Sequence, residues 1–255
     1  MKVTVFIGSG RKGHTFRASE KFLQNLESLG NVEYEIVRLS DYNLRTCKGC
    51  RLCLDKGEEL CPFKDDRDQL IEKMEKSDGV IFASPNYSFQ VSALMKIFLD
   101  RLGFILHRPR FFGKTFTCIV TQGIVKGQDI VKYLNFVGKG LGFNVVNGSC
   151  IKTFEPITKA GQKKIDGALD RLSRRFYLQL IRKQYPSPGL FWLLGFRMGR
   201  TNIRKGLDES WRDYTYYKEN GWFESDYYYP VRLNLLKKMA GKLFDKLALQ
   251  IIRIN

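Results

Sequence analysis

The strongest constraint on the fold is a regular alternation of short apolar segments with longer amphipathic ones. The short segments are bounded by turn residues, as expected for strands, and cover residues 2–8, 32–39, 79–84, 114–122 and 143–151. Helical spacing of apolar residues falls between them, at 15–30, 65–75, 91–102 and 128–139. Such alternation requires right-handed crossovers and a sheet covered on both faces. We therefore predict a doubly wound α/β fold with five parallel strands.

Five parallel strands suit the flavodoxin-like order 2-1-3-4-5. In sheets of this order, ligands bind at the carboxyl ends of the strands, where strands 1 and 3 separate. The turns at 8–15, 40–62 and 84–90 are expected to meet at that edge.

The composition of the chain changes after residue 150. Residues 151–255 hold 21 basic and 10 acidic residues, whereas residues 1–150 hold 22 and 16. A basic helix is predicted at 158–183, and the sequence "YPSPG" at 185–189 marks a boundary. We predict one domain over residues 1–183, with a cysteine loop at 46–63, and an aromatic-rich, basic, helical extension over 184–255.

The chain is expected to work in the cytoplasm. Its first apolar run is six residues long, too short for the apolar region of a signal peptide, and no apolar run suits a spanning helix. Thiols stay reduced in that compartment, which disfavours disulfides. The net charge of +17 comes with no recognisable nucleic-acid-binding motif, so we expect no nucleic acid as partner.

The glycine-rich segment "GSGRKGHT" (8–15) leaves the first strand and opens a helix, an arrangement that favours anion binding. Three interpretations are open. Gly8, Gly10 and Gly13 match the dinucleotide pattern G-x-G-x-x-G; the segment also nearly matches a P-loop, but with His14 in place of lysine. The third interpretation is a cradle for one phosphate, and a simple strand-to-helix turn remains the alternative to all three.

A second segment, "SPNYSFQVSALMKIFLDRL" (84–102), follows the third strand at the same edge. Its aromatic, proline-stiffened start suits a flat ring. The two segments together resemble the NAD(P)H-dependent FMN reductase family of flavodoxin-like proteins, over residues 1–155. Gly10 stands where the family usually has proline, and the first loop is one residue shorter.

The resemblance implies a set of FMN-binding residues and a function. The phosphate end would comprise Ser9, Arg11, Lys12, Gly13, His14 and Thr15; Pro85, Asn86, Tyr87, Ser88 and Phe89 would border the ring; Thr121 and Gly123 would form a third loop. The protein would be a flavin-dependent oxidoreductase that passes electrons from NAD(P)H through FMN to a quinone, a flavin or another acceptor. No catalytic side chain is expected, because the flavin carries the chemistry.

Several points stay open at this level. The acceptor, the choice between NADH and NADPH, and the size of an expected homo-oligomer, a dimer or larger, are not specified. The alternative function is a non-enzymatic electron carrier or redox sensor that docks on a partner or membrane through its C-terminal extension. His107, with Arg108 and Arg110, is a candidate border of a substrate site, but we interpret these residues as a basic surface loop.

Four cysteines lie within the second turn: Cys47, Cys50, Cys53 and Cys61. The spacing C-x2-C-x2-C, with a fourth cysteine further along, is typical of [4Fe–4S] binding, whereas structural zinc usually uses two separated C-x-x-C pairs. The run "CKGCRLC…CPFKDD" resembles the iron–sulfur flavoproteins and also relatives without a cluster. We favour the cluster, with metal-free thiols and zinc as alternatives. Cys118 and Cys150 lie in apolar strands and are expected in the core.

Residues 231–254 have the pattern of a basic amphipathic helix. Apolar residues gather on one face, namely Leu235, Leu236, Met239, Leu243, Phe244, Leu247, Ile251 and Ile252. Lys237, Lys238, Lys242, Lys246 and Arg253 lie towards the other. We favour packing of the apolar face on the core domain or on a second subunit over contact with an anionic membrane.

Overall fold

The computed structural model describes the backbone of residues 1–254 and the side chains of residues 1–251. The chain divides into two compact units, which are described separately. The first comprises Met1–Lys48 and Phe63–Lys183, and the second comprises Gly49–Pro62 and Gln184–Asn255. The cysteine segment after Lys48 therefore packs with the C-terminal part of the chain.

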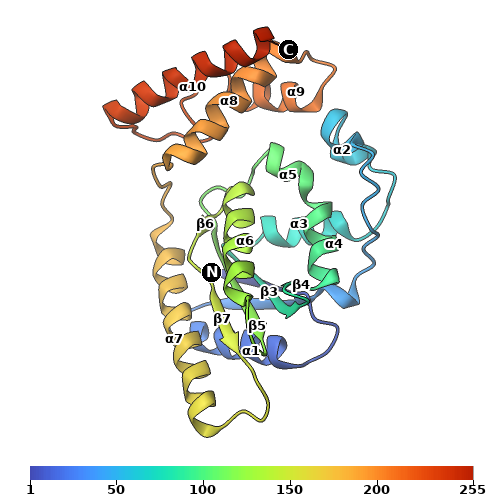
Figure 1. The fold of residues 1–255 in the computed structure, drawn as a ribbon, viewed down its shortest axis with the longest axis vertical. Helices are drawn as coiled ribbons and strands as arrows, with labels where there is room; N and C mark the ends of the chain where they lie inside the picture. The colour runs from blue at the N-terminus through green and yellow to red at the C-terminus, as the bar shows by residue number, and fades with distance from the viewer. Residues whose placement is uncertain (255) are drawn as a thin grey trace. The chain divides into compact units, whose positions relative to one another are not determined.

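The first unit is built on a parallel sheet, and the predicted α/β, flavodoxin-like fold is confirmed (Figure 1). Its strands run in the order β2 (Glu33–Arg38), β1 (Lys2–Ile7), β3 (Gly79–Tyr87) and β5 (Thr115–Gln122), and both β6 (Asn144–Val145) and β7 (Ser149–Lys152) pair with β5. A short strand, β4 (Gln90–Val91), pairs antiparallel with the end of β3. The described sheet thus has seven strands rather than five, because the fifth predicted strand is split and a hairpin is added.

Helices cover both faces of this sheet (Figure 1). On one face lie α1 (His14–Glu27) and α7 (Lys159–Arg182); on the other lie α3 (Arg67–Glu75), α4 (Ala93–Arg101) and α6 (Gly127–Gly140). Two short helices, η1 (Leu39–Asp41) and α5 (Gly103–His107), follow β2 and α4. Fully buried phenylalanines fill both interfaces: Phe22 meets Phe176 on the first face, with ring centroids 5.6 Å apart, and Phe6 stacks on Phe98 at 5.3 Å on the second.

The segment after α5 does not lie on the surface as interpreted from the sequence. Arg108 is fully buried, and its guanidinium lies 5.7 Å from the ring centroid of Phe104. The interpretation as a basic surface loop is therefore wrong for Arg108, because a delocalised guanidinium can be buried against an aromatic face.

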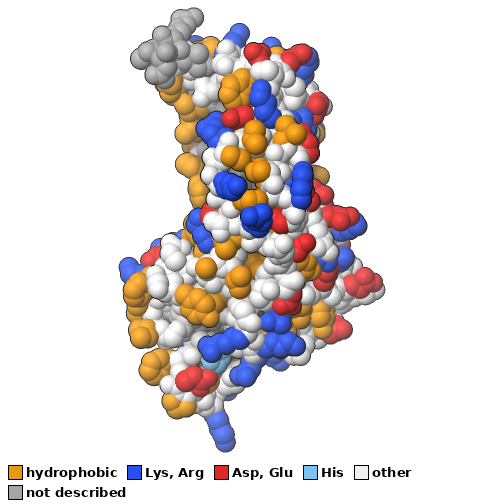
Figure 2. All heavy atoms as spheres, turned by 90° about the vertical axis from the view of Figure 1, so that its right-hand side faces the viewer, with side chains coloured by type: hydrophobic (Ala, Val, Ile, Leu, Met, Phe, Trp, Pro, Cys, Tyr) orange, Lys and Arg blue, Asp and Glu red, His pale blue; other side chains and the backbone are white. Residues whose placement is uncertain are grey.

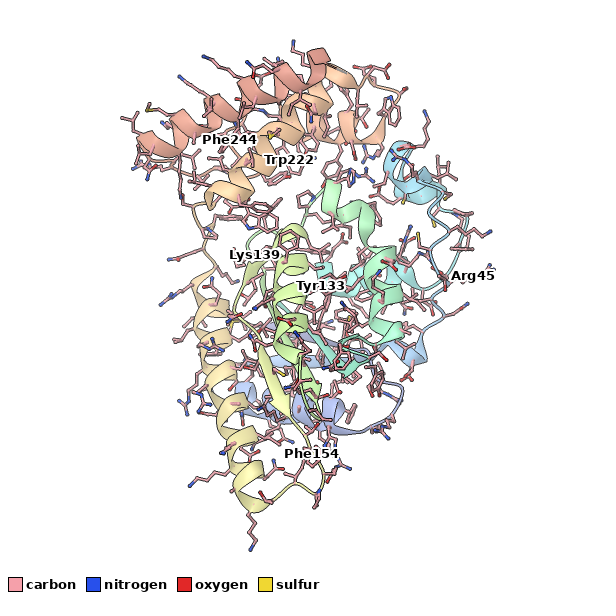
Figure 3. The ribbon with its side chains drawn as sticks, in the orientation of Figure 1. Arg45, Tyr133, Lys139, Phe154, Trp222 and Phe244 are labelled. Carbon is pink, nitrogen blue, oxygen red and sulfur yellow. The ribbon has the colours of Figure 1, made fainter. Side chains whose placement is uncertain are left out.

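The second unit is helical. The cysteine segment forms α2 (Leu52–Asp55) and η2 (Glu58–Leu60), and the C-terminal part forms α8 (Leu190–Gly206), α9 (Arg212–Glu219) and α10 (Leu235–Ile254). Lys56, next to α2, donates from Nζ to the carbonyl of Ser210 at 3.1 Å and lies over the ring of Trp211, which immediately precedes α9. Trp222, labelled in Figure 3, is buried against Tyr217 and Tyr228. Over the part of the chain described, we find no helix long and apolar enough to cross a membrane.

The turn after β1 packs tightly against the start of α4. The N–H of Gly8 donates to the carbonyl of Ala83, and the hydroxyl of Ser92 donates to the carbonyl of Gly8. A Cβ on Gly8 would lie 2.8 Å from the Cβ of Met95 and 2.7 Å from Ser92 Oγ, whereas a Cβ on Gly10 would meet nothing within 4 Å. Gly8 is therefore required by packing, and Gly10 is not.

Arg45, labelled in Figure 3, and Asp65 flank the cysteine segment in sequence and contact each other; we call the residues around this contact the neck. Asp65 accepts hydrogen bonds from both Nη atoms of Arg101 and from the backbone N–H of Arg45, and the Asp65 side chain is fully buried. Burial alone would raise the pKa of Asp65, but the hydrogen bonds from Arg101 and Arg45 hold that pKa below its usual range. The ring of Phe63 completes the neck, with Arg45, Lys48 and Arg101 all within 5.2 Å of its centroid.

We expect Gly8→Ala to lower the free energy of unfolding by about 1–3 kcal/mol, because the new methyl group overlaps Met95 and Ser92. Gly10→Ala, in the same loop, serves as the matched control and should change it by less than about 0.5 kcal/mol. Urea unfolding of both variants measures the difference. Equal losses in the two would contradict the packing assigned to Gly8.

Asp65→Asn should cost about 3–5 kcal/mol of unfolding free energy at neutral pH, because it leaves Arg101 buried without its carboxylate. The folded-state pKa of Asp65 is lowered, so its stabilisation is present above the unfolded-state pKa near 4 and is lost as pH falls through the folded-state value. The difference in unfolding free energy between wild type and variant should therefore decrease in acid. Asp100→Asn, which breaks the exposed pair with Lys96, is the control and should cost less than about 1 kcal/mol.

Candidate functional site

A cavity of about 260 Å³ lies at the carboxyl ends of β1, β3 and β5. Ten of the thirteen predicted binding residues line it, namely Ser9, Arg11, Gly13, His14, Thr15, Pro85, Asn86, Tyr87, Thr121 and Gly123. Three segments far apart in sequence therefore meet at the edge that the strand order predicted. Gln122, Thr153 and Glu155 also line the cavity but were not predicted. The same edge rule, applied to residues that follow the last strand, would have found Thr153 and Glu155.

One end of the cavity is rich in hydroxyl groups. Ser9, Thr15 and Thr121 are each at most 4% exposed, and the hydroxyls of Thr15 and Thr121 are 2.7 Å apart. Helix α1 begins at His14, so its first N–H groups and the positive end of its dipole lie at this wall. Together with Arg11, the arrangement provides donors and positive charge of the kind that a phosphate group requires.

His14 and Glu155 form a contact at the mouth of the cavity, with His14 Nε2 2.8 Å from Glu155 Oε1. Both residues also line a neighbouring hollow of about 430 Å³, and Lys12 belongs to that hollow rather than to the cavity. The Lys12 ammonium lies 5.4 Å from the ring centroid of Phe16. Lys12 is therefore the one residue of the predicted phosphate group that the cavity does not include.

A tight hairpin forms the rim on the side of β3. Tyr87 pairs with Gln90, so the turn between β3 and β4 consists of Ser88 and Phe89 alone. Both have positive φ, 49° and 63°, a left-handed conformation that costs non-glycine residues roughly 1–2 kcal/mol each. Ser88 and Phe89 do not line the cavity, and the Phe89 side chain is 64% exposed at the tip. Strain of this kind concentrates at ligand sites.

Asn86 carries the clearest sign that the cavity wall is incomplete without a ligand. Its Nδ2 donates to the carbonyl of Val125 at 2.7 Å, which fixes the orientation of the amide. Its Oδ1 is buried and has no hydrogen-bond partner. A buried acceptor left unpaired costs about 1–3 kcal/mol. A ligand with an N–H group at this wall would remove that cost, so the donor set fits FMN, which combines a phosphate with a flat ring bearing an N–H.

The four clustered cysteines differ in environment. Cys47 and Cys50 are exposed, Cys53 is half-buried and Cys61 is buried. Cys47 belongs to the first unit and the other three to the second, and within the described residues no three His, Cys, Asp or Glu side chains are gathered as a metal site. Gly49 and Arg51 have left-handed backbones between these cysteines. The thiols are thus present at the predicted spacing but do not converge in this conformation.

The two remaining cysteines lie in strands. Cys118, in β5, is fully buried, and its thiol donates to the carbonyl of Val131 and to Asn135 Oδ1. Cys150, in β7, is half-buried. Burial raises the pKa of both thiols, which keeps them protonated and unreactive at neutral pH.

Comparison with known proteins identifies the family of the first 153 residues. The model of the NADPH-dependent FMN reductase family matches residues 1–153. An iron–sulfur flavoprotein from Archaeoglobus fulgidus is 38% identical over 159 residues, which cover 58% of this chain and 71% of the relative. An iron–sulfur flavoprotein from Clostridioides difficile is 30% identical over 192 residues, 73% of this chain and 82% of the relative.

Solved structures agree on the fold. RosB, determined with bound 8-demethyl-8-formylriboflavin-5'-phosphate, superposes with a TM-score of 0.57 at 14% identity and covers 92% of each chain. An NAD(P)H:quinone oxidoreductase from Methanothermobacter marburgensis gives a TM-score of 0.54 at 16% identity, with 68% of this chain and 98% of that one covered. The family resemblance is thereby confirmed: the chain belongs to the NADPH-dependent FMN reductase family and is an oxidoreductase of the FMN-dependent, NAD(P)H-using kind.

Proposed function

We propose that the cavity at the ends of β1, β3 and β5 binds FMN, and that the protein passes electrons from NADH or NADPH to a quinone, a free flavin or another small acceptor. The observation that carries this proposal is the buried, unpartnered Oδ1 of Asn86 in a cavity that ten predicted residues line.

At the phosphate end, the chain would hold the ligand by short-range donors rather than by a metal. In this conformation Ser9 Oγ donates to the carbonyl of Arg11, and the hydroxyls of Thr15 and Thr121 bond to each other. These hydroxyls would turn to donate to an incoming phosphate, and the start of α1 adds backbone N–H groups. Arg11 supplies a permanent positive charge. Glu155 would give up its contact with His14 to an incoming phosphate, because the phosphate carries more negative charge and more acceptor oxygens.

At the ring end, bound FMN would supply hydride acceptance at its N5 atom and release of electrons to the acceptor. The protein would orient the ring. Asn86 Oδ1 would accept a hydrogen bond from a ring N–H, and the exposed rings of Tyr87 and Phe89 would offer flat apolar surfaces for stacking. The strained turn would keep these rings at the rim, where substrate arrives.

Two glycine variants of the hairpin test the site, because one of them should gain stability while losing activity. Phe89→Gly removes both the left-handed strain and the aromatic ring, whereas Ser88→Gly removes the strain alone. Both variants should be about 0.5–1 kcal/mol more stable than wild type after the entropy cost of glycine. Phe89→Gly should lower kcat/KM for NAD(P)H oxidation about tenfold, since a stacked aromatic pair contributes about 1.5 kcal/mol. Ser88→Gly should retain activity.

The measurements are FMN content after purification, thermal unfolding, and steady-state NADH and NADPH oxidation with a quinone, free flavin and ferricyanide as acceptors. Purified protein with no flavin, and no affinity for added FMN by fluorescence quenching, would contradict the proposed site. Equal activity of the two glycine variants would contradict the role of Phe89 while leaving FMN binding intact.

We further propose that the loop at 46–63 holds a [4Fe–4S] cluster through Cys47, Cys50, Cys53 and Cys61. The spacing of the four thiols and the names of the relatives at 30–38% identity support this. The chain adds two features: left-handed turns at Gly49 and Arg51 that let the backbone curl, and basic side chains at Lys48 and Arg51 that offset thiolate charge.

Anaerobically purified protein should contain about four irons and four sulfides per chain, with charge-transfer absorption beside the flavin bands. Cys50→Ser and Cys53→Ser should lose the iron and keep the flavin. Cys150→Ser, a thiol outside the loop, is the control and should keep both. Flavin bands without iron in the wild type would overturn the cluster, and stoichiometric zinc in its place would identify the metal alternative.

A further inference from the structure

Helix α10 packs against α8 with its polar side. Asp245 of α10 accepts from Arg200 Nη2 and Thr201 Oγ1 at 2.7 and 3.0 Å, and its other oxygen lies 2.7 Å from Arg197 Nη2. Gly241 and Ala248, small residues one turn before and one turn after Asp245, are buried on the same side. The contact between these two helices thus rests on a carboxylate, two guanidinium groups and close backbone approach, rather than on leucines.

The leucines of α10 lie on its outer side. Leu235, Leu236, Met239, Leu243, Leu247 and Ile251 are between 40% and 75% exposed. Met239, Leu243, Leu247 and Ile251 follow each other at intervals of four and form a continuous stripe along the helix. Phe244, labelled in Figure 3, is half-buried and does not belong to this stripe. The side chains of Ile252 and Arg253 lie outside the described residues.

This arrangement is the reverse of that in an ordinary surface helix, where the apolar face packs inward and charges face water. Within its own unit, the described residues leave this apolar side exposed; packing on the core domain or on a second subunit stays a prediction. The exposed apolar surface extends beyond α10: Lys237 donates to the hydroxyl of Ser187, which places the start of α8 beside the start of α10. Leu190 and Phe191, in the first turn of α8, are 56% and 61% exposed. A patch of this kind indicates an interaction surface.

Positive charge accompanies the stripe. Lys238, Lys242 and Lys246 are exposed and form a second row at intervals of four along one border of the stripe. Figure 2 shows basic, acidic and hydrophobic side chains interspersed over the visible face of this unit, so the charge of α10 is taken from its own residues. Helix α10 contains five basic residues and one acidic residue, and that acid, Asp245, is held by Arg197 and Arg200. The outer side of α10 therefore carries only positive charge beside its leucines.

We propose that the stripe and lysine row of α10 dock in the plane of an anionic lipid bilayer. The acyl region would receive the leucines, and the lysines would reach anionic headgroups at the border. A second copy of the chain fits less well, because its own α10 would bring a like-charged row of lysines and no acidic residue free to pair with them. The helix would lie on the membrane and not span it, in keeping with its charge content.

The test is flotation of the full-length protein with vesicles of phosphatidylcholine, alone or with one-third phosphatidylglycerol. We expect the protein to float with the anionic vesicles and to remain at the bottom with neutral ones, and flotation to decrease as salt rises. The triple variant K238Q/K242Q/K246Q should weaken binding by roughly fivefold per lysine, or about a hundredfold in all. L243Q/L247Q should abolish flotation, since the apolar anchor is lost.

Matched controls lie on α7. K159Q/K163Q/K164Q removes the same charge from three exposed lysines of the first unit, and L178Q/I181Q removes two exposed apolar side chains. Neither should reduce flotation more than about threefold. All substituted positions are exposed, so each variant should unfold at the wild-type temperature, and light scattering reports its mass.

Failure of the wild type to bind anionic vesicles would overturn the proposal. A halved mass of L243Q/L247Q relative to wild type, with flotation unchanged, would equally overturn it and assign the stripe to a contact between copies. Equal losses of vesicle binding in the α10 and α7 lysine variants would show that binding depends only on net charge. That result would also contradict the proposed docking surface.

Discussion

The buried ion pair between Asp65 and Arg101 is the contact on which the working parts of the first unit depend. Arg101 is the last residue of α4, and Ser92 caps the first turn of the same helix. Ser92 donates to the carbonyl of Gly8 in the phosphate-side loop, and the hairpin of Ser88 and Phe89 runs directly into α4. One nine-residue helix therefore connects the glycine loop, the aromatic rim and the neck of the cysteine segment. Displacement of α4 would disturb all three together.

The ion pair between Asp65 and Arg101 matters more for the position of the neighbouring segments than for net stability. A buried ion pair is weak evidence for net stability, because desolvation offsets much of its Coulomb attraction, yet removing one partner is costly. Its effect here is positional: Asp65 also accepts from the N–H of Arg45 and so holds both ends of the cysteine segment. The hairpin is the place where two successive non-glycine residues, Ser88 and Phe89, adopt left-handed conformations; Arg51, Lys126 and Lys183 do so singly. Within the described residues, Asn86 Oδ1 is the buried side-chain atom without a hydrogen-bond partner that belongs to a residue lining the cavity.

The sequence predicted the sheet and the cavity because both depend on local patterns. Apolar runs identified the strands, and the edge rule brought three loops together without any knowledge of contacts. The fifth strand was predicted as one element, but its pairing with β5 is interrupted between β6 and β7. There Asn135 Nδ2 donates to Asn147 Oδ1, and Asn135 Oδ1 accepts from the N–H of Gly148. The packing of Lys56 on Ser210 and Trp211 was not predictable, because Lys56 and Ser210 lie 154 residues apart and no sequence pattern links the two segments.

The apolar periodicity of helix α10 could not show which side of the helix packs against the rest of its unit. An amphipathic pattern shows that two sides of a helix differ, but it does not say which side the protein covers. In this chain Asp245 determines which side of α10 is covered. It lies opposite the leucines, and its ion pairs with Arg197 and Arg200 hold that side of α10 against α8. Once the only carboxylate of the helix is used internally, its lysines have no acidic neighbour on α10 and its leucines have no apolar cover from α8. A surface that is both apolar and negatively charged satisfies both groups, and a lipid headgroup layer has those two properties at the same depth.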